Sequence, residues 1–242
     1  MTKRSLSEMN IWINGASRGI GAALVEKLAD SGAKLILSAS SSDSFKEMAP
    51  EYAENDNVFF FPCDIRNEKE VEKFMAQAEA VTGGIDILVN NAGIGKFAQL
   101  KDFSLEDFDE MSRVNFRGIF LTTQSVLPKM LEKNFGVIIN ILSVVVKKPF
   151  TYSSIYGATK SAIHGLSASL REEVRDNGIK VIEVYPGATA TEIWDKKVLD
   201  EQGERMMPPE DVAAAIYNTI DLSLRDKMMI EEIQLRPQGG DL

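Results

Sequence analysis

The sequence of 242 residues has one cysteine, Cys63, and one histidine, His164. One cysteine cannot form a disulfide within the chain, and the two residues together cannot build a His/Cys-rich metal site. A Ser–His–Asp triad would also use up the single imidazole. We therefore predict no bound metal, and we expect proton transfer to depend on tyrosine, lysine or carboxylate groups.

Clustered positive charge is also scarce. The chain has 27 Lys and Arg against 36 Asp and Glu, a formal net charge of −9, and no run of Lys or Arg is longer than Lys147–Lys148. Basic patches are typical of proteins that bind nucleic acid or anionic lipid, so we predict neither partner. The longest apolar run, VIINILSVVV, is shorter than the ~18 residues of a membrane span, and the N-terminal residues lack the apolar stretch of a secretory signal. We expect a cytoplasmic protein.

Short apolar runs alternate along the chain with segments of helical periodicity. Strands that are apolar on both faces and separated by helices indicate a parallel sheet covered on both sides. We predict a doubly wound, Rossmann-type α/β fold in a single domain, 1–242, because no linker, repeat or low-complexity tract divides the chain. The less regular segment at about 188–210 is the predicted substrate loop. The predicted strands cover 11–14, 33–39, 58–64, 85–93, 136–143 and 179–187, and the longer helices cover about 105–131 and 154–175.

A glycine-rich turn, NGASRGIG, follows the first predicted strand and opens the first helix. Its glycines, Gly15, Gly19 and Gly21, would let the backbone turn tightly and approach a pyrophosphate at the helix N-terminus. A plain helix-capping turn is the alternative. The position between strand and helix favours a dinucleotide-binding turn.

The end of the second strand bears on which dinucleotide binds. NAD enzymes often place an acid there for the ribose 2′-hydroxyl, whereas this chain has serines up to Ser42 and no acid before Asp43. Arg18 and Ser40 suit a 2′-phosphate instead, so we predict NADP(H) in preference to NAD(H). Asp64, at the end of the third strand, is predicted either to bind the adenine amine or to cap the following helix.

A tyrosine and a lysine, Tyr156 and Lys160, are four residues apart on a predicted helix and share one face. A phenol with a pKa of roughly 10 is a poor acid-base group near neutral pH unless a cation stabilises its phenolate. Ser143 lies thirteen residues upstream, at the carboxyl end of the fifth strand. An exposed surface pair is the alternative at this spacing, and the position of Ser143 favours a Ser/Tyr/Lys catalytic group.

The strings NGASRGIG, NNAG (90–93), VNF around Asn115, Ser143, YGATK and PGATAT (186–191) span nearly the whole chain. In their order and spacing the chain resembles the single-domain branch of the short-chain dehydrogenase/reductase family. The resemblance implies that Tyr156 donates a proton to the substrate oxygen and that Ser143 orients that oxygen. It also implies that Lys160 holds the nicotinamide ribose and lowers the pKa of Tyr156, and that Asn115 supports a relay water.

The same resemblance supplies the cofactor-binding residues. Two departures from the family pattern stand out: Asn14 replaces the customary Thr before the glycine turn, and three valines, 144–146, replace the usual small residues after the catalytic serine. The resemblance implies that the dinucleotide contacts Gly15, Ser17, Arg18, Gly19, Ile20, Gly21, Ser40, Asp64, Ile65, Asn91, Ala92, Gly93, Tyr156, Lys160, Pro186, Gly187, Thr189 and Thr191.

Aromatic and methionine side chains in the loops suit a flat or apolar carbonyl compound, although each would also suit the core. Several strings are similar to bacterial sepiapterin-reductase-like members of the family, and a pteridine ring would stack on Trp194. The predicted substrate residues are Phe97, Phe150, Trp194 and Met206, with Tyr152 and Met207 beside them.

Two alternative functions remain. A 3-oxoacyl-(acyl-carrier-protein) reductase would need a basic patch for its acidic partner, for which Lys96, Lys147 and Lys148 are the candidates. A non-catalytic NADP-binding sensor or structural protein would leave the Ser/Tyr/Lys group unused. Because family members usually pair through the helices that start near Leu105 and Ser154 in this chain, we also expect a homodimer or homotetramer.

Overall fold

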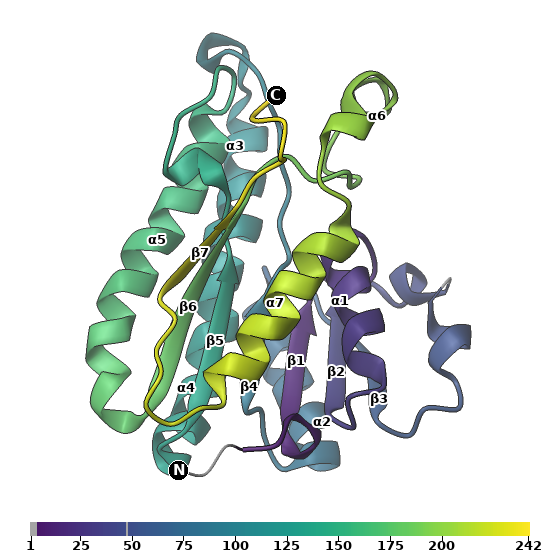
Figure 1. Cartoon of the computed structure of the whole chain (residues 1–242), viewed down its shortest axis with the longest axis vertical. Helices are drawn as coiled ribbons and strands as arrows, with labels where there is room; N and C mark the ends of the chain where they lie inside the picture. The colour runs from purple at the N-terminus through teal and green to yellow at the C-terminus, as the bar shows by residue number, and fades with distance from the viewer. Residues whose placement is uncertain (1–3, 47) are drawn as a thin grey trace.

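The computed structural model describes residues 4–46 and 48–242 and has a central parallel sheet between two layers of helices (Figure 1). Within these ranges the sheet has seven strands in the order β3-β2-β1-β4-β5-β6-β7, so the winding direction reverses between β1 and β4. The doubly wound α/β fold is therefore confirmed. The strands are β1 (Asn10–Asn14), β2 (Lys34–Ala39), β3 (Val58–Pro62), β4 (Ile87–Asn90), β5 (Gly136–Ile141), β6 (Ile179–Pro186) and β7 (Glu232–Leu235).

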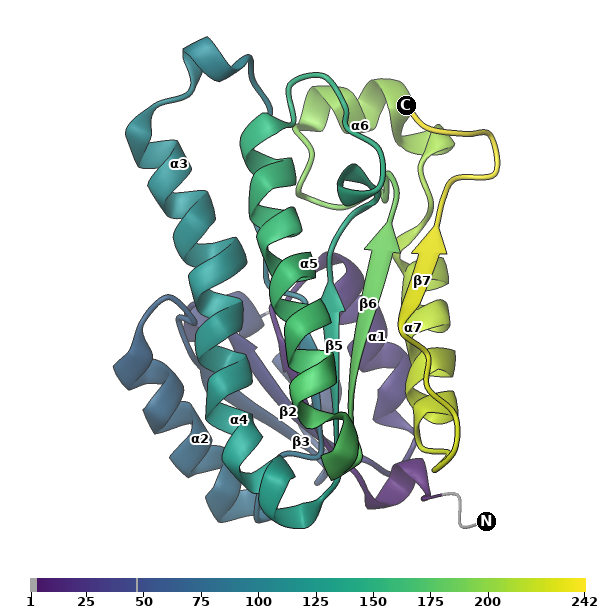
Figure 2. The same cartoon turned by 90° about the vertical axis from the view of Figure 1, so that its left-hand side faces the viewer.

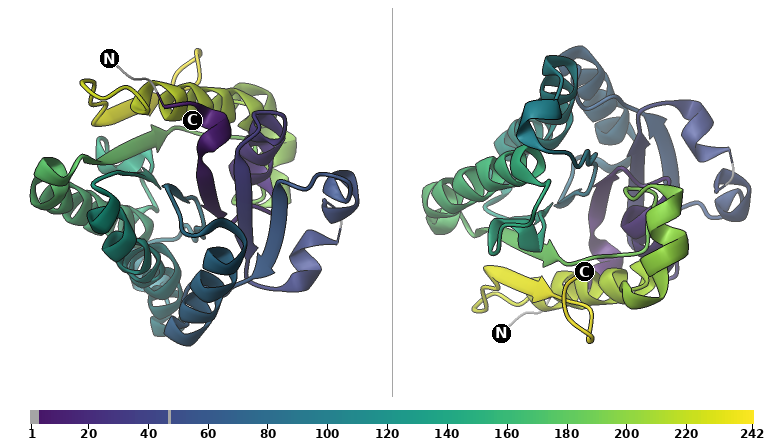
Figure 3. Two further views of the ribbon diagram at one scale, coloured as in Figure 1. Left: turned by 90° about the horizontal axis from the view of Figure 1, so that it is seen from below. Right: turned by 90° about the horizontal axis from the view of Figure 1, so that it is seen from above.

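Alternating side chains of the central strands fill both cores. Ile11 and Ile13 of β1 pack with α1 and α7 on one face, whereas Trp12 stacks on Phe74 of α2 on the other. Figure 2 shows α2, α4 and α5 side by side over that second face, and the end-on views of Figure 3 show α7 on the opposite side. The helices are α1 (Gly19–Ala29), α2 (Glu68–Thr82), α3 (Leu105–Ser112), α4 (Ile119–Lys133), α5 (Ser154–Val174), α6 (Lys196–Gln202) and α7 (Pro209–Ser223). Throughout the described ranges, no helix has both the length and the apolar character that a bilayer span requires.

Several of the predicted elements have different bounds in the structure, and three of them differ most. The fourth strand ends at Asn90 and the fifth at Ile141, because the residues that follow them turn into the loops above the sheet. The helix predicted at about 105–131 is interrupted by a π-helical segment, Arg113–Gly118. A β-carbon at Gly118 would lie 2.7 Å from the Ile65 side chain, so the glycine allows this segment to pack closely on the loop before α2.

The C-terminal elements were not predicted. β7 is an edge strand whose residues alternate between exposed and half-buried, and its four residues, EIQL, are too few and too polar for the apolar signal on which strand prediction depends. α6 lies inside the segment 188–210 that was predicted to be an irregular substrate loop, and α7 begins before that segment ends.

Buried amides form a row across the middle of the sheet. Asn14, Asn90 and Asn140 occupy paired positions on β1, β4 and β5, and none of the three is exposed to solvent. Asn90 accepts hydrogen bonds from Asn14 Nδ2 (2.7 Å) and Thr122 Oγ1 (2.7 Å), and it donates to Asn140 Oδ1 (2.8 Å) and Thr123 Oγ1 (3.1 Å). Each amide is satisfied, so the row specifies the strand register without leaving an unpaired polar group.

Candidate functional site

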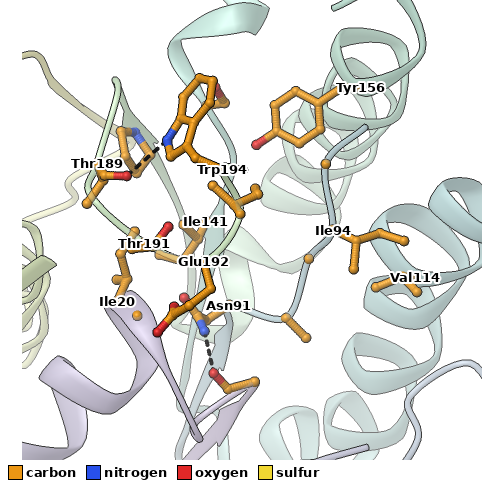
Figure 4. A pocket seen from close by; sticks show the side chains of 18 of the residues that line it. Ile20, Asn91, Ile94, Val114, Ile141, Tyr156, Thr189, Thr191, Glu192 and Trp194 are labelled. Atoms are coloured by element: carbon orange, nitrogen blue, oxygen red, sulfur yellow. Dashed lines mark hydrogen bonds between the residues drawn. The ribbon is translucent and has the colours of Figure 1, made fainter. Parts of the chain in front are cut away.

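A cleft of about 1250 Å³ opens above the carboxyl ends of the strands, where the winding direction reverses (Figure 4). Parallel α/β sheets bind their ligands at this position, because loops from neighbouring strands diverge there. The loops after β1 through β6 all contribute to the walls of the cleft.

The glycine-rich turn forms the floor of the cleft. Gly15 has a left-handed φ of 66°, and a β-carbon there would lie 2.7 Å from Ala92 Cα. A β-carbon at Gly21 would lie 2.2 Å from the Gly15 carbonyl oxygen, so neither position accepts a side chain. Asn14 Oδ1 accepts hydrogen bonds from the backbone N–H groups of Asn91 (2.9 Å) and Ala92 (2.8 Å). The turns after β1 and β4 therefore form one unit with an open backbone surface at the start of α1, which fits a pyrophosphate.

The predicted cofactor residues lie together in the structure. Of these residues, only Gly21 does not line the cleft. Because it has no side chain, it allows α1 to pack against the glycine turn. At the end of β2, Lys46 joins Arg18 and Ser40 as a second cation, although it is paired with Asp43 at 2.8 Å. The residues lining the cleft include Gly15, Ser17, Arg18, Gly19, Ile20, Ser40, Asp64, Ile65, Asn91, Ala92, Gly93, Tyr156, Lys160, Pro186, Gly187, Thr189 and Thr191.

Asp64 lines the cleft but already has a charged partner that sequence reasoning missed. The Arg66 guanidinium donates from Nε (2.9 Å) and Nη2 (2.8 Å) to the two carboxylate oxygens of Asp64, and these bonds hold the pKa of Asp64 below its ordinary value. The alternative prediction for Asp64, a helix cap, is wrong, because Asn67 caps α2 by accepting from the N–H of Lys69. In the sequence, only the Asp-x-Arg spacing of Asp64 and Arg66 indicates this ion pair.

Tyr156, Lys160 and Ser143 meet at the inner end of the cleft. Ser143 lies close enough to Tyr156 to lower the pKa of its phenol, and the Lys160 ammonium donates to the Ile141 carbonyl oxygen at 2.8 Å. Tyr156 is 8% exposed and Lys160 is 4% exposed. Helical spacing places both side chains on the face of α5 that turns towards the strand ends, as the sequence predicted.

Burial controls the ionisation of this group. It raises the pKa of Tyr156 to about 12, against the smaller, opposite effect of the Ser143 hydrogen bond, and it lowers the pKa of Lys160 to about 8. The Lys160 nitrogen lies 5.9 Å from the centre of the Tyr156 ring. Burial is the largest cause of the shift in the Tyr156 pKa, and the lowering of that pKa by Lys160 stays a prediction.

Asn115 lies in the π-helical segment and is fully buried. Its side-chain oxygen accepts from the N–H of Ile94 (2.9 Å), and its Nδ2 donates to the Ile94 carbonyl (2.9 Å) and to Thr159 Oγ1 (3.1 Å). The side chain ties the loop after β4 to α5. Its role in a water relay stays a prediction.

Aromatic rings close the outer end of the cleft. Phe97 stacks on Trp194 with ring centres 5.1 Å apart and also lies edge-on to Tyr156 at 5.4 Å, while Trp194 Nε1 donates to the Thr189 carbonyl at 3.1 Å. The other predicted aromatic residues, Phe150 and Tyr152, line the cleft as well. Met206 and Met207 do not line it, because the chain after α6 turns back towards α7; Met206 is buried and Met207 packs against the α1/α7 core. Val145, one of the three valines after the catalytic serine, lines the cleft as well, and Ile193 and Glu192 are lining residues that were not predicted.

The three lysines proposed as a basic patch all have acidic partners. Lys147 pairs with Glu232 (2.7 Å), Lys148 pairs with Asp241 (2.9 Å), and Lys96 pairs with Asp107. These pairs neutralise the charge that an acidic carrier protein would need.

The single histidine lies away from the cleft. His164 Nδ1 is 3.0 Å from Glu183 Oε1 and 3.0 Å from the Tyr185 hydroxyl, in a polar cluster between α5 and β6 that also includes Glu232. Arg171 pairs with Glu183 at 2.9 Å, and Lys147 pairs with Glu232, so both carboxylates of the cluster are already neutralised.

Comparison with known proteins gives a consistent match. The family model described as short chain dehydrogenase matches residues 9–202. Among curated proteins, an uncharacterized oxidoreductase of Staphylococcus aureus is 33% identical over 225 residues, covering 93% of this chain and 95% of that protein. A further uncharacterized oxidoreductase, from Staphylococcus haemolyticus, is 32% identical with the same coverage.

Solved structures are also similar. The closed form of a serine dehydrogenase complexed with NADP+ has a TM-score of 0.86 and 29% identity, covering 93% of this chain and 94% of that one. An alcohol dehydrogenase from the archaeon Thermococcus sibiricus, complexed with 5-hydroxy-NADP, has a TM-score of 0.84 and 29% identity, covering 95% of this chain and 97% of that one.

Proposed function

Because the chain belongs to the short-chain dehydrogenase family, an NAD(P)-dependent oxidoreductase family, we propose that it reduces a carbonyl compound to an alcohol with NADPH, with Tyr156 as the proton donor. The observation that carries the proposal is the meeting of Ser143, Tyr156 and Lys160 in the lining of the cleft, with the tyrosine and the lysine buried. When bound, NADPH supplies the hydride. Ser143 orients the substrate oxygen, and Tyr156 gives it a proton.

The floor of the cleft suits the dinucleotide. The backbone of the glycine turn would hold the pyrophosphate, and Lys160, next to Gly93, would hold the nicotinamide ribose. Arg18, Ser40 and Lys46 support the preference for a 2′-phosphate, as does the NADP bound in similar structures.

This cofactor preference predicts the effect of replacing Arg18 by Ala. The Kd of NADPH should rise about tenfold while that of NADH changes less than about twofold, because only NADPH carries the phosphate that the guanidinium would bind. Titration of protein fluorescence measures both constants. Faster turnover by the unmodified protein with NADH than with NADPH would contradict the preference.

We propose a flat or apolar carbonyl compound as the substrate, because Phe97, Phe150 and Trp194 surround the reacting hydroxyl. A sepiapterin-like ring fits this description. The paired state of Lys96, Lys147 and Lys148 argues against an acyl-carrier-protein substrate. Following NADPH oxidation with sepiapterin, an acetoacetyl thioester and simple diketones tests the proposal; turnover of the thioester alone would favour the carrier-protein alternative.

A homo-oligomer is part of the proposal. Leu105, Phe108, Phe116 and Phe120 are between 40% and 74% exposed along α3, the π-helical segment and α4. Exposed apolar side chains in such number on one side are typical of an interface. We expect a dimer or tetramer by light scattering, and Phe120→Glu should lower the measured mass because it would bury a charge in that interface. A monomeric mass for the unmodified protein would contradict this prediction. The cytoplasmic location stays a prediction.

A further inference from the structure

Glu192 is an acidic residue of the cleft that the proposed chemistry does not use. Its carboxylate lies over the glycine turn, and Oε2 is 3.5 Å from the place that a β-carbon would occupy at Gly19. Figure 4 shows the side chain extending towards Asn91 and the start of α1, away from Tyr156. Its carboxylate thus faces the backbone surface to which we assign the pyrophosphate.

The other carboxylates that line the cleft are neutralised. Asp43 pairs with Lys46, Asp64 and Glu110 pair with Arg66, and Asp241 pairs with Lys148 and Arg236. Among the lining acids, Glu192 alone has no basic partner in residues 4–46 and 48–242. Its carboxylate is therefore not held in an ion pair by a neighbouring cation.

The backbone around Glu192 is held in place. The N–H of Ala190 donates to the Met207 carbonyl (2.9 Å), and the N–H of Met207 donates to the Ala188 carbonyl (3.0 Å). On the other side, Trp194 is fixed by its hydrogen bond to Thr189 and by the Phe97 ring. These contacts keep the backbone of Glu192 beside Gly19, so only rotation of the exposed side chain moves the charge away from the turn.

We propose that Glu192 weakens dinucleotide binding by opposing the negative charge of the pyrophosphate at the start of α1. The inference rests on the proposed function. The positive end of the α1 dipole attracts the pyrophosphate, and the Glu192 carboxylate subtracts from that attraction. Like charges several ångströms apart at a protein surface repel strongly enough to change a dissociation constant by about three- to tenfold. The residue thereby sets cofactor affinity and favours release.

Replacing Glu192 by Gln removes the charge and keeps the shape of the side chain. We expect the Kd of NADPH, measured by fluorescence titration, to fall about three- to tenfold at about 20 mM salt and the difference from the unmodified protein to shrink at about 500 mM salt. Binding of 2′-AMP, which has the ribose phosphate of NADP but no pyrophosphate, should not change. Glu204→Gln is the matched control, because Glu204 is exposed and lies outside the lining of the cleft.

Equal or weaker NADPH binding by Glu192→Gln would overturn the inference, as would an equal gain in Glu204→Gln or one that is the same at both salt concentrations. Thermal melting checks that each variant is folded. If the unmodified protein binds neither NADPH nor NADH, the proposed function fails as well. A failure of the inference alone is therefore distinguishable, since NADPH then binds with a Kd that is indifferent to residue 192.

Discussion

Replacing Tyr156 by Phe is expected to lower kcat for carbonyl reduction by about 10³-fold, within the range that general acid catalysis contributes. The variant loses only the hydroxyl that donates the proton, and the ring keeps its edge-on contact with Phe97. Burial raises the pKa of Tyr156 to about 12, so the phenol carries its proton at neutral pH, and transfer of that proton requires stabilisation of the phenolate. Steady-state NADPH oxidation measures the loss, and the Kd of NADPH should stay within about twofold of the unmodified value.

The matched control is Tyr152→Phe, the same chemical change at an aromatic residue that also lines the cleft. Tyr152 is 51% exposed and is not part of the Ser143–Tyr156 pair, so its replacement should alter kcat by less than about threefold. Full turnover in Tyr156→Phe would show that another group supplies the proton. Bound NADPH with no turnover in either the unmodified protein or the variant, across the substrate panel, would support the alternative of a non-catalytic NADP-binding protein.

Replacing Asn90 by Ala is expected to lower the free energy of unfolding by at least about 3 kcal/mol. The side chain makes four hydrogen bonds at the centre of the sheet, and its removal leaves buried partners such as Asn14 and Asn140 without them. An unsatisfied buried polar group costs about 1–3 kcal/mol, and Asn90→Ala creates several. Urea denaturation of the protein without added cofactor measures the change.

Two further variants calibrate that result. Thr123→Val removes one hydrogen bond of the row and should cost about 1 kcal/mol, whereas Asn177→Ala affects a long 3.4 Å bond at the surface and should cost less than about 0.5 kcal/mol. The predicted order of stability loss is Asn90, then Thr123, then Asn177. A value for Asn90→Ala no larger than that for Thr123→Val would contradict the role given to the amide row. If Asn90→Ala does not accumulate as folded protein, the order of the other two variants still tests that role.

The elements with a local signal were predicted from the sequence. Apolar runs separated by helical periodicity define six of the strands, and the spacing of Gly15, Gly19 and Gly21 depends on the local geometry of one turn. The Tyr156–Lys160 spacing depends on one helical turn. In each of these cases the residues that fix the structure lie within a few positions of one another.

The features that were missed depend on contacts between distant segments. Lys147 and Lys148 find their partners 85 and 93 residues further along the chain, so no local pattern distinguishes them from a free basic patch. Met206 lies away from the cleft because the chain there leads into α7, which packs against α1. The helix α7 itself was not predicted from the sequence. The ionisation of Tyr156 and Lys160 likewise depends on burial, which their spacing alone does not give.

The hydrogen bonds of the Asn14 amide also limit which residues can replace it. Its side-chain oxygen accepts hydrogen bonds from the turn after β4, and its side-chain nitrogen donates to Asn90, which lies 76 positions away in the chain. A threonine at position 14, usual in the family, has a single hydroxyl for both tasks. With threonine at position 14, Asn90 Oδ1 would keep the hydrogen bond from Thr122 and would lose the one from Asn14 Nδ2 unless the threonine hydroxyl donated to it. A substitution at position 14 would therefore affect the cofactor turn and the centre of the sheet together.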